Sequence, residues 1–179
     1  MDTKTGEGLY GMKMLSEDVK TLFFTDDGKI PNHPSWPVLL YVGKLKEPQD
    51  ALDVFEQNGW TNGWKNGVFD YHHYHSNTHE VLGVMSGEAV LLLGGEDGVS
   101  VTVSKGDVIV LPAGTGHKCI GSSTDFKVAG AYPNGLEHNL KKGEPADRPA
   151  VLDDIMLVPL PDKDPLFGSD GPLMELWKS

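Results

Sequence analysis

The chain has 179 residues, a formal net charge of −11 at pH 7, and 39% hydrophobic and 23% charged residues. This length and composition are typical of one domain that buries its own hydrophobic core. Because such a negative charge repels phosphate backbones and anionic lipid headgroups, we expect neither nucleic acid nor membrane surfaces as partners.

Cysteine content and the N-terminal residues predict a cytoplasmic location. Cys119 is the single cysteine and has no partner for an internal disulfide. The first 15 residues have neither the long apolar run nor the cleavage site of a secretory signal. No stretch of the sequence reaches the length of a membrane span. We therefore expect residues 1–179 to form one domain in a reducing compartment.

Residues 1–37 are predicted to wrap around the body of the domain. A short amphipathic piece at 14–24 is followed by a turn-rich stretch with three prolines. Because proline donates no ladder hydrogen bond, this stretch is not expected to form a central strand of a sheet. After it, residues 38–42 (VLLYV) are predicted as a strand, and residues 48–58 as a helix that is bounded by Pro and Gly.

An all-β pattern occupies residues 64–132, which we expect to be the core of the fold. Short runs of Val, Leu and aromatic residues alternate with Gly-containing turns about every ten residues, as in a sandwich, barrel or jelly roll. In VSVTVS at 99–104 the valines share one face of a strand and the hydroxyl residues the other. The predicted strands are 38–42, 68–75, 80–85, 88–93, 99–104, 107–111, 117–120, 126–132 and 155–160.

The C-terminal part, residues 136–179, is predicted to contain a polar loop at 136–150, the strand at 155–160 and an irregular tail. No internal repeat is visible, which argues against two copies of the domain. Because a jelly roll leaves edge strands that need cover, we expect a homodimer. The strands at 38–42 and 155–160 are the expected covering material.

A group of histidines predicts a metal site. Four of the seven histidines fall within YHHYHSNTHE at 71–80. Side chains alternate along a strand, so His73 and His75 project from one face and His72 from the other. Glu80 opens the next strand, and His117 follows a turn that contains Pro and Gly. Three imidazole nitrogens and one carboxylate oxygen suit one divalent ion of iron, manganese, nickel, cobalt, copper or zinc rather than calcium or magnesium.

The spacing of these residues resembles the two motifs of the cupin superfamily. The first motif, G-x5-H-x-H-x4-E-x6-G, is met by Gly67, His73, His75, Glu80 and Gly87. The second, G-x5-P-x-G-x2-H-x3-N, is met by Gly106, Pro112, Gly114 and His117, with Gly121 in place of the usual asparagine. The phrases IPNHP, VLPAGTGH and GAYP further resemble the YjlB-like cupins. The resemblance implies a double-stranded β-helix (jelly-roll) barrel with short peripheral helices and one bound metal ion, but it names no reaction.

Other polar residues near the motifs receive weaker assignments. Tyr71 precedes the first expected ligand by two residues, so its ring and hydroxyl are the candidate substrate contact, with core packing as the alternative. By strand parity His72 and His79 point away from the metal. His33 and His138 are assigned to loops without a chemical role.

Three further residues could have packing roles instead of chemical ones. Trp60 and Trp64 either cover the mouth of the barrel or lie on a surface loop. Cys119 is expected to be a small buried hydrophobe rather than a nucleophile or an extra ligand.

Two functions remain open at this point. The first is a metal-dependent enzyme that acts on a small organic molecule, because four side-chain ligands leave two positions of an octahedral ion open. In the superfamily that the chain resembles, such sites serve dioxygenases, decarboxylases and isomerases, and we rank dioxygenase-like oxidation with iron or manganese first. The second is a non-catalytic module that uses the metal to hold a ligand or to stabilise the barrel, for which a closed zinc shell would suffice.

Overall fold

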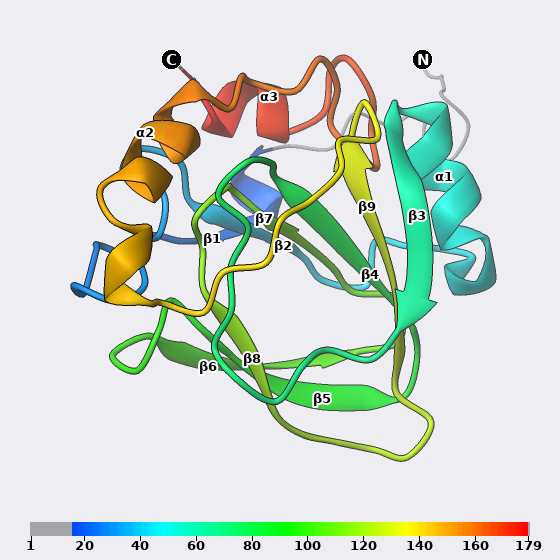
Figure 1. Ribbon diagram of the computed structural model, residues 1–179. Helices are drawn as coiled ribbons and strands as arrows, with labels where there is room; N and C mark the ends of the chain where they lie inside the picture. Colours follow the sequence, from blue (N-terminus) through cyan, green and yellow to red (C-terminus); the bar gives the residue numbers. More distant parts are fainter. Residues whose placement is uncertain (1–15, 179) are drawn as a thin grey trace.

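Two antiparallel β-sheets face each other in the computed structural model, which describes residues 16–178 (Figure 1). The larger sheet has six strands in the order β1 (Lys20–Leu22), β2 (Val38–Tyr41), β7 (Val108–Leu111), β4 (Glu80–Ser86), β9 (Lys127–Pro133) and β3 (Trp60–Asn66). The smaller sheet has the order β6 (Val99–Ser104), β5 (Glu88–Leu93) and β8 (His117–Ser122). The predicted all-β jelly-roll architecture is thus confirmed.

The space between the two sheets holds a hydrophobic core. Leu82 and Val84 of β4 face Leu91 and Leu93 of β5, and all four side chains are buried. Alternate residues of β4 point to the opposite face, as strand geometry requires. Glu80 therefore belongs to the inner set with Leu82, and this places a carboxylate at one end of the core.

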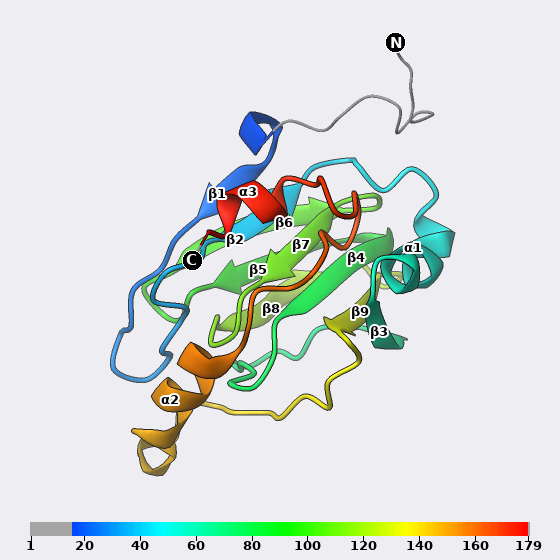
Figure 2. The same ribbon diagram turned by 90° about the horizontal axis from the view of Figure 1, so that it is seen from above.

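The outer face of the six-stranded sheet is also covered. Helices α1 (Ala51–Gln57) and α3 (Leu173–Leu176) lie over it (Figure 2). Phe55 of α1 and Leu173 of α3 are fully buried in one cluster with Val81 of β4. Because this sheet is buried on both faces, strands such as β2 are continuous apolar runs in the sequence.

The short helices complete the peripheral structure. The predicted helix at 48–58 is found as a 3-10 turn, η2 (Pro48–Asp50), followed by α1. Two further 3-10 turns are η1 (Ser16–Asp18) and η3 (Pro145–Asp147). Of the amphipathic piece at 14–24, residues 14 and 15 lie outside the described residues, and the rest contains η1 and β1. None of the described helices combines the length and apolar character that crossing a membrane requires.

The predicted strand at 155–160 is wrong. Residues 155–157 are the last turn of helix α2 (Ala150–Leu157). Val151 and Ile155, one helical turn apart, are buried, whereas Met156 and Leu157 are 67% and 80% exposed. The apolar run therefore follows helical periodicity, in which only one side of the segment faces the core.

The continuous strand predicted at 68–75 is also wrong. Within it only His73 and Tyr74 form ladder contacts, and each is an isolated bridge. His73 pairs with His117, whereas Tyr74 pairs with Lys141 in the loop after β9. Because the segment bonds to a different neighbour on each side at successive residues, it crosses the opening between the sheets instead of extending along one of them (Figure 1).

The sheet order bears on the two segments that were predicted to cover edge strands in a homodimer. Strand β2 lies between β1 and β7, so residues 38–42 do not cover an edge of another sheet. Within the described residues the edges are β1 and β3 of the larger sheet and β6 and β8 of the smaller one. Neither of the two segments is therefore a strand that is free to cover an edge of a second copy. The homodimer stays a prediction that light scattering can test.

Candidate metal centre

Three segments, of which only the one with His117 is distant in the sequence, bring the expected ligands together. Glu80 is the first residue of β4, and His117 is the first residue of β8. The backbones of His73 and His117 exchange two hydrogen bonds, of 3.2 and 3.0 Å. The carbonyl of His75 accepts a further bond from the N–H of Gly114 (2.8 Å). Residues of the second motif thus position His73 and His75 of the first motif beside Glu80 at the start of β4.

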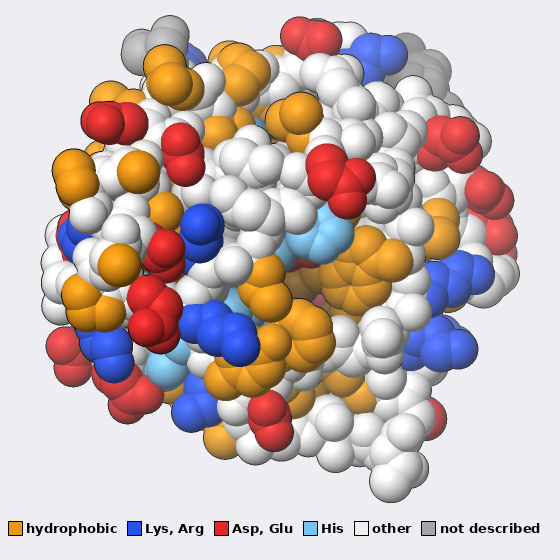
Figure 3. Space-filling model, in the orientation of Figure 1, with side chains coloured by type: hydrophobic (Ala, Val, Ile, Leu, Met, Phe, Trp, Pro, Cys, Tyr) orange, Lys and Arg blue, Asp and Glu red, His pale blue; other side chains and the backbone are white. Residues whose placement is uncertain are grey.

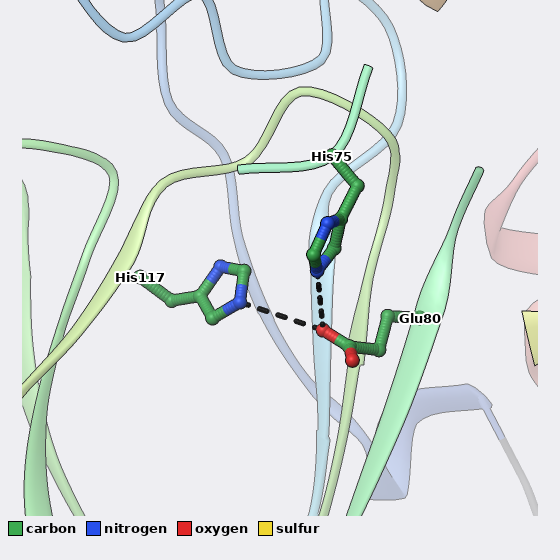
Figure 4. Close-up of side chains that lie close together, drawn as sticks. All are labelled: His75, Glu80 and His117. Carbon is green, nitrogen blue, oxygen red and sulfur yellow. Dashed lines mark ion pairs between the residues drawn. The ribbon is translucent and has the colours of Figure 1, made fainter. Parts of the chain in front are cut away.

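Glu80 lies between two of the histidines (Figure 4). Its Oε1 is 3.3 Å from Nε2 of His75 and 3.4 Å from Nε2 of His117. One possible ligand atom of each residue lies within 4.8 Å of the others, and all three residues are buried. His73 is outside this group of three, but its ring centroid is 4.0 Å from that of His117 and it lines the same cavity. The arrangement can hold a divalent cation.

Each of the three histidines is oriented by a backbone carbonyl that faces its Nδ1. The carbonyls belong to Tyr71 for His73 (3.0 Å), Thr115 for His117 (3.0 Å) and Asn139 for His75. A carbonyl oxygen only accepts hydrogen bonds, so Nδ1 carries the proton in all three rings. This tautomer leaves the lone pair of Nε2 available to a metal ion, as is usual for metal-binding histidines.

The other oxygen of Glu80 is held by two aromatic side chains. The hydroxyl of Tyr132 donates to Oε2 of Glu80 (2.9 Å), and Nε1 of Trp64 donates to the hydroxyl of Tyr132 (2.8 Å). Trp64 lies on β3 opposite Gly130 of β9, where a side-chain carbon would collide with the indole ring. The absence of a side chain at Gly130 therefore lets Trp64 reach Tyr132. Because Tyr132 in turn donates to Oε2 of Glu80, only Oε1 remains free of protein donors.

The two tryptophans have different environments. Trp64 lines the cavity, consistent with the alternative that it covers the mouth of the barrel. Trp60 is buried in the outer core, and its Nε1 donates to the carbonyl of Lys163 (2.9 Å). Neither residue lies on a loop, because both belong to β3.

The environment of the site favours a neutral His73 and an ionised Glu80, the states in which these residues can bind a metal. Burial and the nearby His117 lower the pKa of His73 to about 3, so this ring is neutral at neutral pH. Burial opposes ionisation of Glu80, but the nearby rings of His117 and His75 outweigh it and hold its pKa below the usual value. Burial also disfavours protonated His75, but the facing carboxylate prevails and raises its pKa. A carboxylate that stays ionised inside the protein is suited to a cation.

A cavity of about 440 Å³ opens beside these residues. Figure 3 shows a hollow on this face with hydrophobic side chains and a histidine at its rim. Charged lining residues other than Glu80 are the exposed Lys65 and Glu137. The apolar lining residues are Trp64, Val68, Phe69, Leu82, Tyr132 and Leu140.

His138 is a cavity residue that the sequence analysis missed. Its ring stacks on Tyr132 with centroids 4.5 Å apart and planes 12° apart, and it meets the edge of His75 at 5.1 Å. The Tyr74–Lys141 bridge holds the loop that carries it across the opening. A lone histidine in a polar loop has no periodicity or motif that would reveal this position.

Tyr71 does not occupy the position expected of a substrate contact. Its ring stacks on Phe69 at 5.0 Å and lies beneath Nζ of Lys142 at 4.8 Å. It lines a separate depression with His72 and Glu96, not the histidine cavity. Its contribution to the site is its carbonyl oxygen, which orients His73.

Two other histidines of the first motif region lie away from the cavity as predicted, although neither of them belongs to a strand. Nε2 of His72 is 2.7 Å from Oε2 of Glu96 at the surface. His79 is fully buried, where its Nδ1 accepts from the N–H of Ala113 (2.9 Å) and its Nε2 donates to the carbonyl of Pro159 (3.0 Å). His79 thus has a structural role.

His33 is buried beside His79, and it predicts a loss of stability in acid. Nδ1 of His33 accepts the N–H groups of Ser35 (3.1 Å) and Trp36 (2.9 Å), and burial lowers its pKa to about 4. As the pH falls from the unfolded value of about 6.5 to 4, the unfolded chain binds a proton that the folded chain does not. The unfolding free energy therefore decreases, by up to about 1.4 kcal/mol per pH unit for this group.

The variant His33→Asn tests this cause. An asparagine Oδ1 can accept the same two backbone N–H groups but does not titrate. Urea unfolding with a chelator present, measured between pH 7 and 4, should give a shallower pH dependence for the variant than for the native chain. Equal slopes would show that His33 does not contribute to the acid sensitivity.

Comparison with known proteins agrees with this geometry. The family model for the cupin domain matches residues 64–128. The uncharacterised protein YjlB of Bacillus subtilis (strain 168) is 45% identical over 163 residues, which cover 91% of this chain and 99% of the relative. The match therefore extends well beyond the two motifs.

Solved structures show weaker similarity. The acireductone dioxygenase of Bacillus anthracis, which has a cadmium ion in its active centre, is 21% identical with a TM-score of 0.36 over 50% of this chain and 60% of that chain. The TDP-quinovose 3,4-ketoisomerase WlaRB of Campylobacter jejuni is 14% identical with a TM-score of 0.41 over 49% of this chain and 72% of that chain. These values are too low to transfer an activity. The family match and the 45% identity over nearly the whole Bacillus relative show that the chain belongs to the cupins, in their YjlB-like group.

Proposed function

We propose that this cupin is a metal-dependent enzyme that acts on a small organic molecule, with dioxygenase-like oxidation as the first choice. His73, His75, Glu80 and His117 would hold one divalent transition-metal ion. The observation that carries the proposal is that three histidines with Nδ1 held by carbonyls meet a buried, ionised glutamate at a cavity.

The donor set fits such an ion. Neutral imidazoles and a carboxylate suit iron, manganese, nickel, cobalt, copper or zinc. A bound ion would supply Lewis-acid or redox chemistry at a substrate oxygen. The contribution of the chain itself is to keep His73 neutral, to keep Glu80 ionised and to exclude bulk water with the apolar lining of the cavity.

The cavity favours an enzyme over a module with a closed metal shell. A structural metal site is filled by protein ligands. Here about 440 Å³ of space adjoins the ligands, within the range of about 300 to 1,000 Å³ that is typical of small-molecule sites. The remaining alternative is a non-catalytic module that binds a ligand through the metal, and turnover distinguishes the two.

Metal analysis and oxygen uptake test the proposal. Protein purified without chelators or a histidine tag should contain about one transition-metal ion per chain. Oxygen uptake with aromatic diols and β-dicarbonyls should require that metal and should be lost in Glu80→Ala. Metal-dependent decarboxylation or isomerisation without oxygen uptake would exclude the dioxygenase. Ligand binding without any turnover would favour the non-catalytic module.

Tyr132→Phe is expected to weaken metal binding by about 10- to 100-fold. The substitution keeps the ring in place and removes the hydroxyl that holds Oε2 of Glu80. Competition with a chromogenic chelator gives the affinity. Tyr71→Phe is the matched control, because that side chain does not line the cavity, and it should bind metal as the native chain does. Equal affinities of the two variants would contradict the role of Tyr132.

A further inference from the structure

We propose, resting on the proposed function, that Asn139 is a positioning residue for the metal ligand His75, and that metal binding and attachment of the loop 136–140 stabilise each other. The observation that carries the inference is a set of four hydrogen bonds between Asn139 and residues 75–77. They join two segments that lie outside the helices and strands.

His75 has less support from regular structure than the other candidate ligands, which lie in strands or in a bridge. It belongs to an irregular segment, where its carbonyl accepts a hydrogen bond from the N–H of Gly114 (2.8 Å). That bond holds the backbone but leaves the side chain free to rotate. The orientation of the ring therefore depends on the contact of its Nδ1 with the carbonyl of Asn139.

Asn139 forms hydrogen bonds with three successive residues beside the site. Its carbonyl accepts from Nδ1 of His75, and its Oδ1 accepts from the N–H of Ser76 (2.9 Å). Its Nδ2 donates to Oγ of Ser76 (2.9 Å), and its own N–H donates to Oδ1 of Asn77 (3.0 Å). The amide side chain supplies an acceptor and a donor to the same serine, so it fixes the carbonyl of Asn139 relative to His75.

Ser76 is itself firmly placed. It is fully buried, and its Oγ donates to Oδ2 of Asp154 in helix α2 (3.1 Å). A hydroxyl can donate one hydrogen bond and accept another, so Oγ serves Asp154 and Asn139 at once. Loss of the Asn139 side chain would leave the N–H of this buried serine without its acceptor and would weaken the attachment of the loop.

Metal binding and attachment of the loop share the ring of His75. The carbonyl of Asn139 holds the ring at Nδ1, and Nε2 is the nitrogen that faces Glu80. An attached loop therefore keeps the ring in the orientation that metal binding needs, and a ring held at Nε2 keeps its Nδ1–H directed at the loop. Because such coupling is reciprocal, detaching the loop weakens metal binding, and the metal stabilises the attached loop.

Asn139→Ala is expected to weaken Zn²⁺ binding by about 10-fold. Competition with a chromogenic chelator gives the affinity, and circular dichroism shows that the chain is folded. Asn134→Gly is the matched control in the preceding turn. Its exposed side chain makes no hydrogen bond among the described residues, and its φ of 57° suits glycine. This variant should bind Zn²⁺ as the native chain does.

Hydrogen exchange, followed by nuclear magnetic resonance, tests the coupling without a substitution. The amide of Lys141 donates to the carbonyl of Tyr74 (2.9 Å) at the end of the loop. It should exchange at least about 10-fold more slowly with saturating Zn²⁺ than with a chelator. The amide of Gly168, in an isolated bridge outside the cavity lining, is the control and should slow less.

The same measurement on Asn139→Ala separates positioning from a merely structural role. Positioning requires that Zn²⁺ slow the exchange of Lys141 less in the variant than in the native chain, whereas a structural role would speed exchange equally with and without Zn²⁺. Native affinity in Asn139→Ala, or exchange of Lys141 that ignores Zn²⁺ in the native chain, would overturn this inference alone. A native chain that binds no Zn²⁺ or other transition metal would overturn the proposed function as well.

Discussion

Replacing His75 or His117 by alanine is expected to reduce the metal content from about one ion per chain to a small fraction of it, while the chain stays folded. Oxygen Oε1 of Glu80 lies between the Nε2 atoms of these two residues, so each loss removes one side of the site. The adjacent His72 cannot take over, because it faces Glu96 at the surface. Elemental analysis gives the metal content, and circular dichroism shows whether the fold persists.

His72→Ala is the matched control for this prediction. It removes an imidazole that neighbours the site in the sequence but contacts Glu96 instead of Glu80, and its metal content should equal that of the native chain. His79→Ala is a poorer control, because His79 makes two buried hydrogen bonds and this variant would also destabilise the fold. Metal loss in His72→Ala, or full retention in His75→Ala, would mean that the assignment of the ligands is wrong.

Asp164→Ala is expected to cause the largest loss of stability, about 3 to 5 kcal/mol of unfolding free energy. Asp164 is fully buried. Its Oδ1 accepts the N–H groups of Leu166 (2.8 Å) and Phe167 (2.9 Å), and its Oδ2 accepts the hydroxyl of Tyr41 and the N–H of Leu173 (3.0 Å). Alanine would leave four donors without this acceptor where water has little access. The C-terminal segment would lose one of its attachments to the outer face of the sheet.

Two further variants separate the loss of these hydrogen bonds from general effects of substitution. Tyr41→Phe removes one of the four donors and should cost about 1 to 2 kcal/mol in urea unfolding. Asp162→Ala removes an exposed carboxylate two residues away and should change stability by less than about 0.5 kcal/mol. A loss below about 1 kcal/mol in Asp164→Ala would show that the four donors find other acceptors.

Features that depend on neighbouring residues could be predicted from the sequence. Strand β6 has the predicted bounds, because its apolar and polar residues alternate with the period of a strand. Strand β5 also has them, because it is an apolar run between two turns. The spacing between His75 and Glu80 likewise reflects local geometry, since a short turn separates the bridge region from the start of β4. In these cases the information lies within a few residues of chain.

The segment at 155–160 shows where local information ends. A short apolar run with a proline is compatible with a buried strand or with the last turn of a helix. Val151 and Ile155 face the core and Met156 faces solvent because one particular side of this helix packs against the rest of the domain. That side is decided by tertiary contacts, which the run itself does not encode.

The sequence by itself determined the all-β class, the cupin motifs and the candidate ligands. The supporting residues of the site were decided by the tertiary structure alone. Trp64 reaches Tyr132 because β3 pairs with β9 at Gly130, and His138 enters the cavity because the loop after β9 crosses the opening between the sheets. These contacts join residues that are far apart in the chain, and their formation depends on which strands pair and at which register. Neither choice leaves a periodic pattern around the individual residue, so composition and spacing could not reveal it.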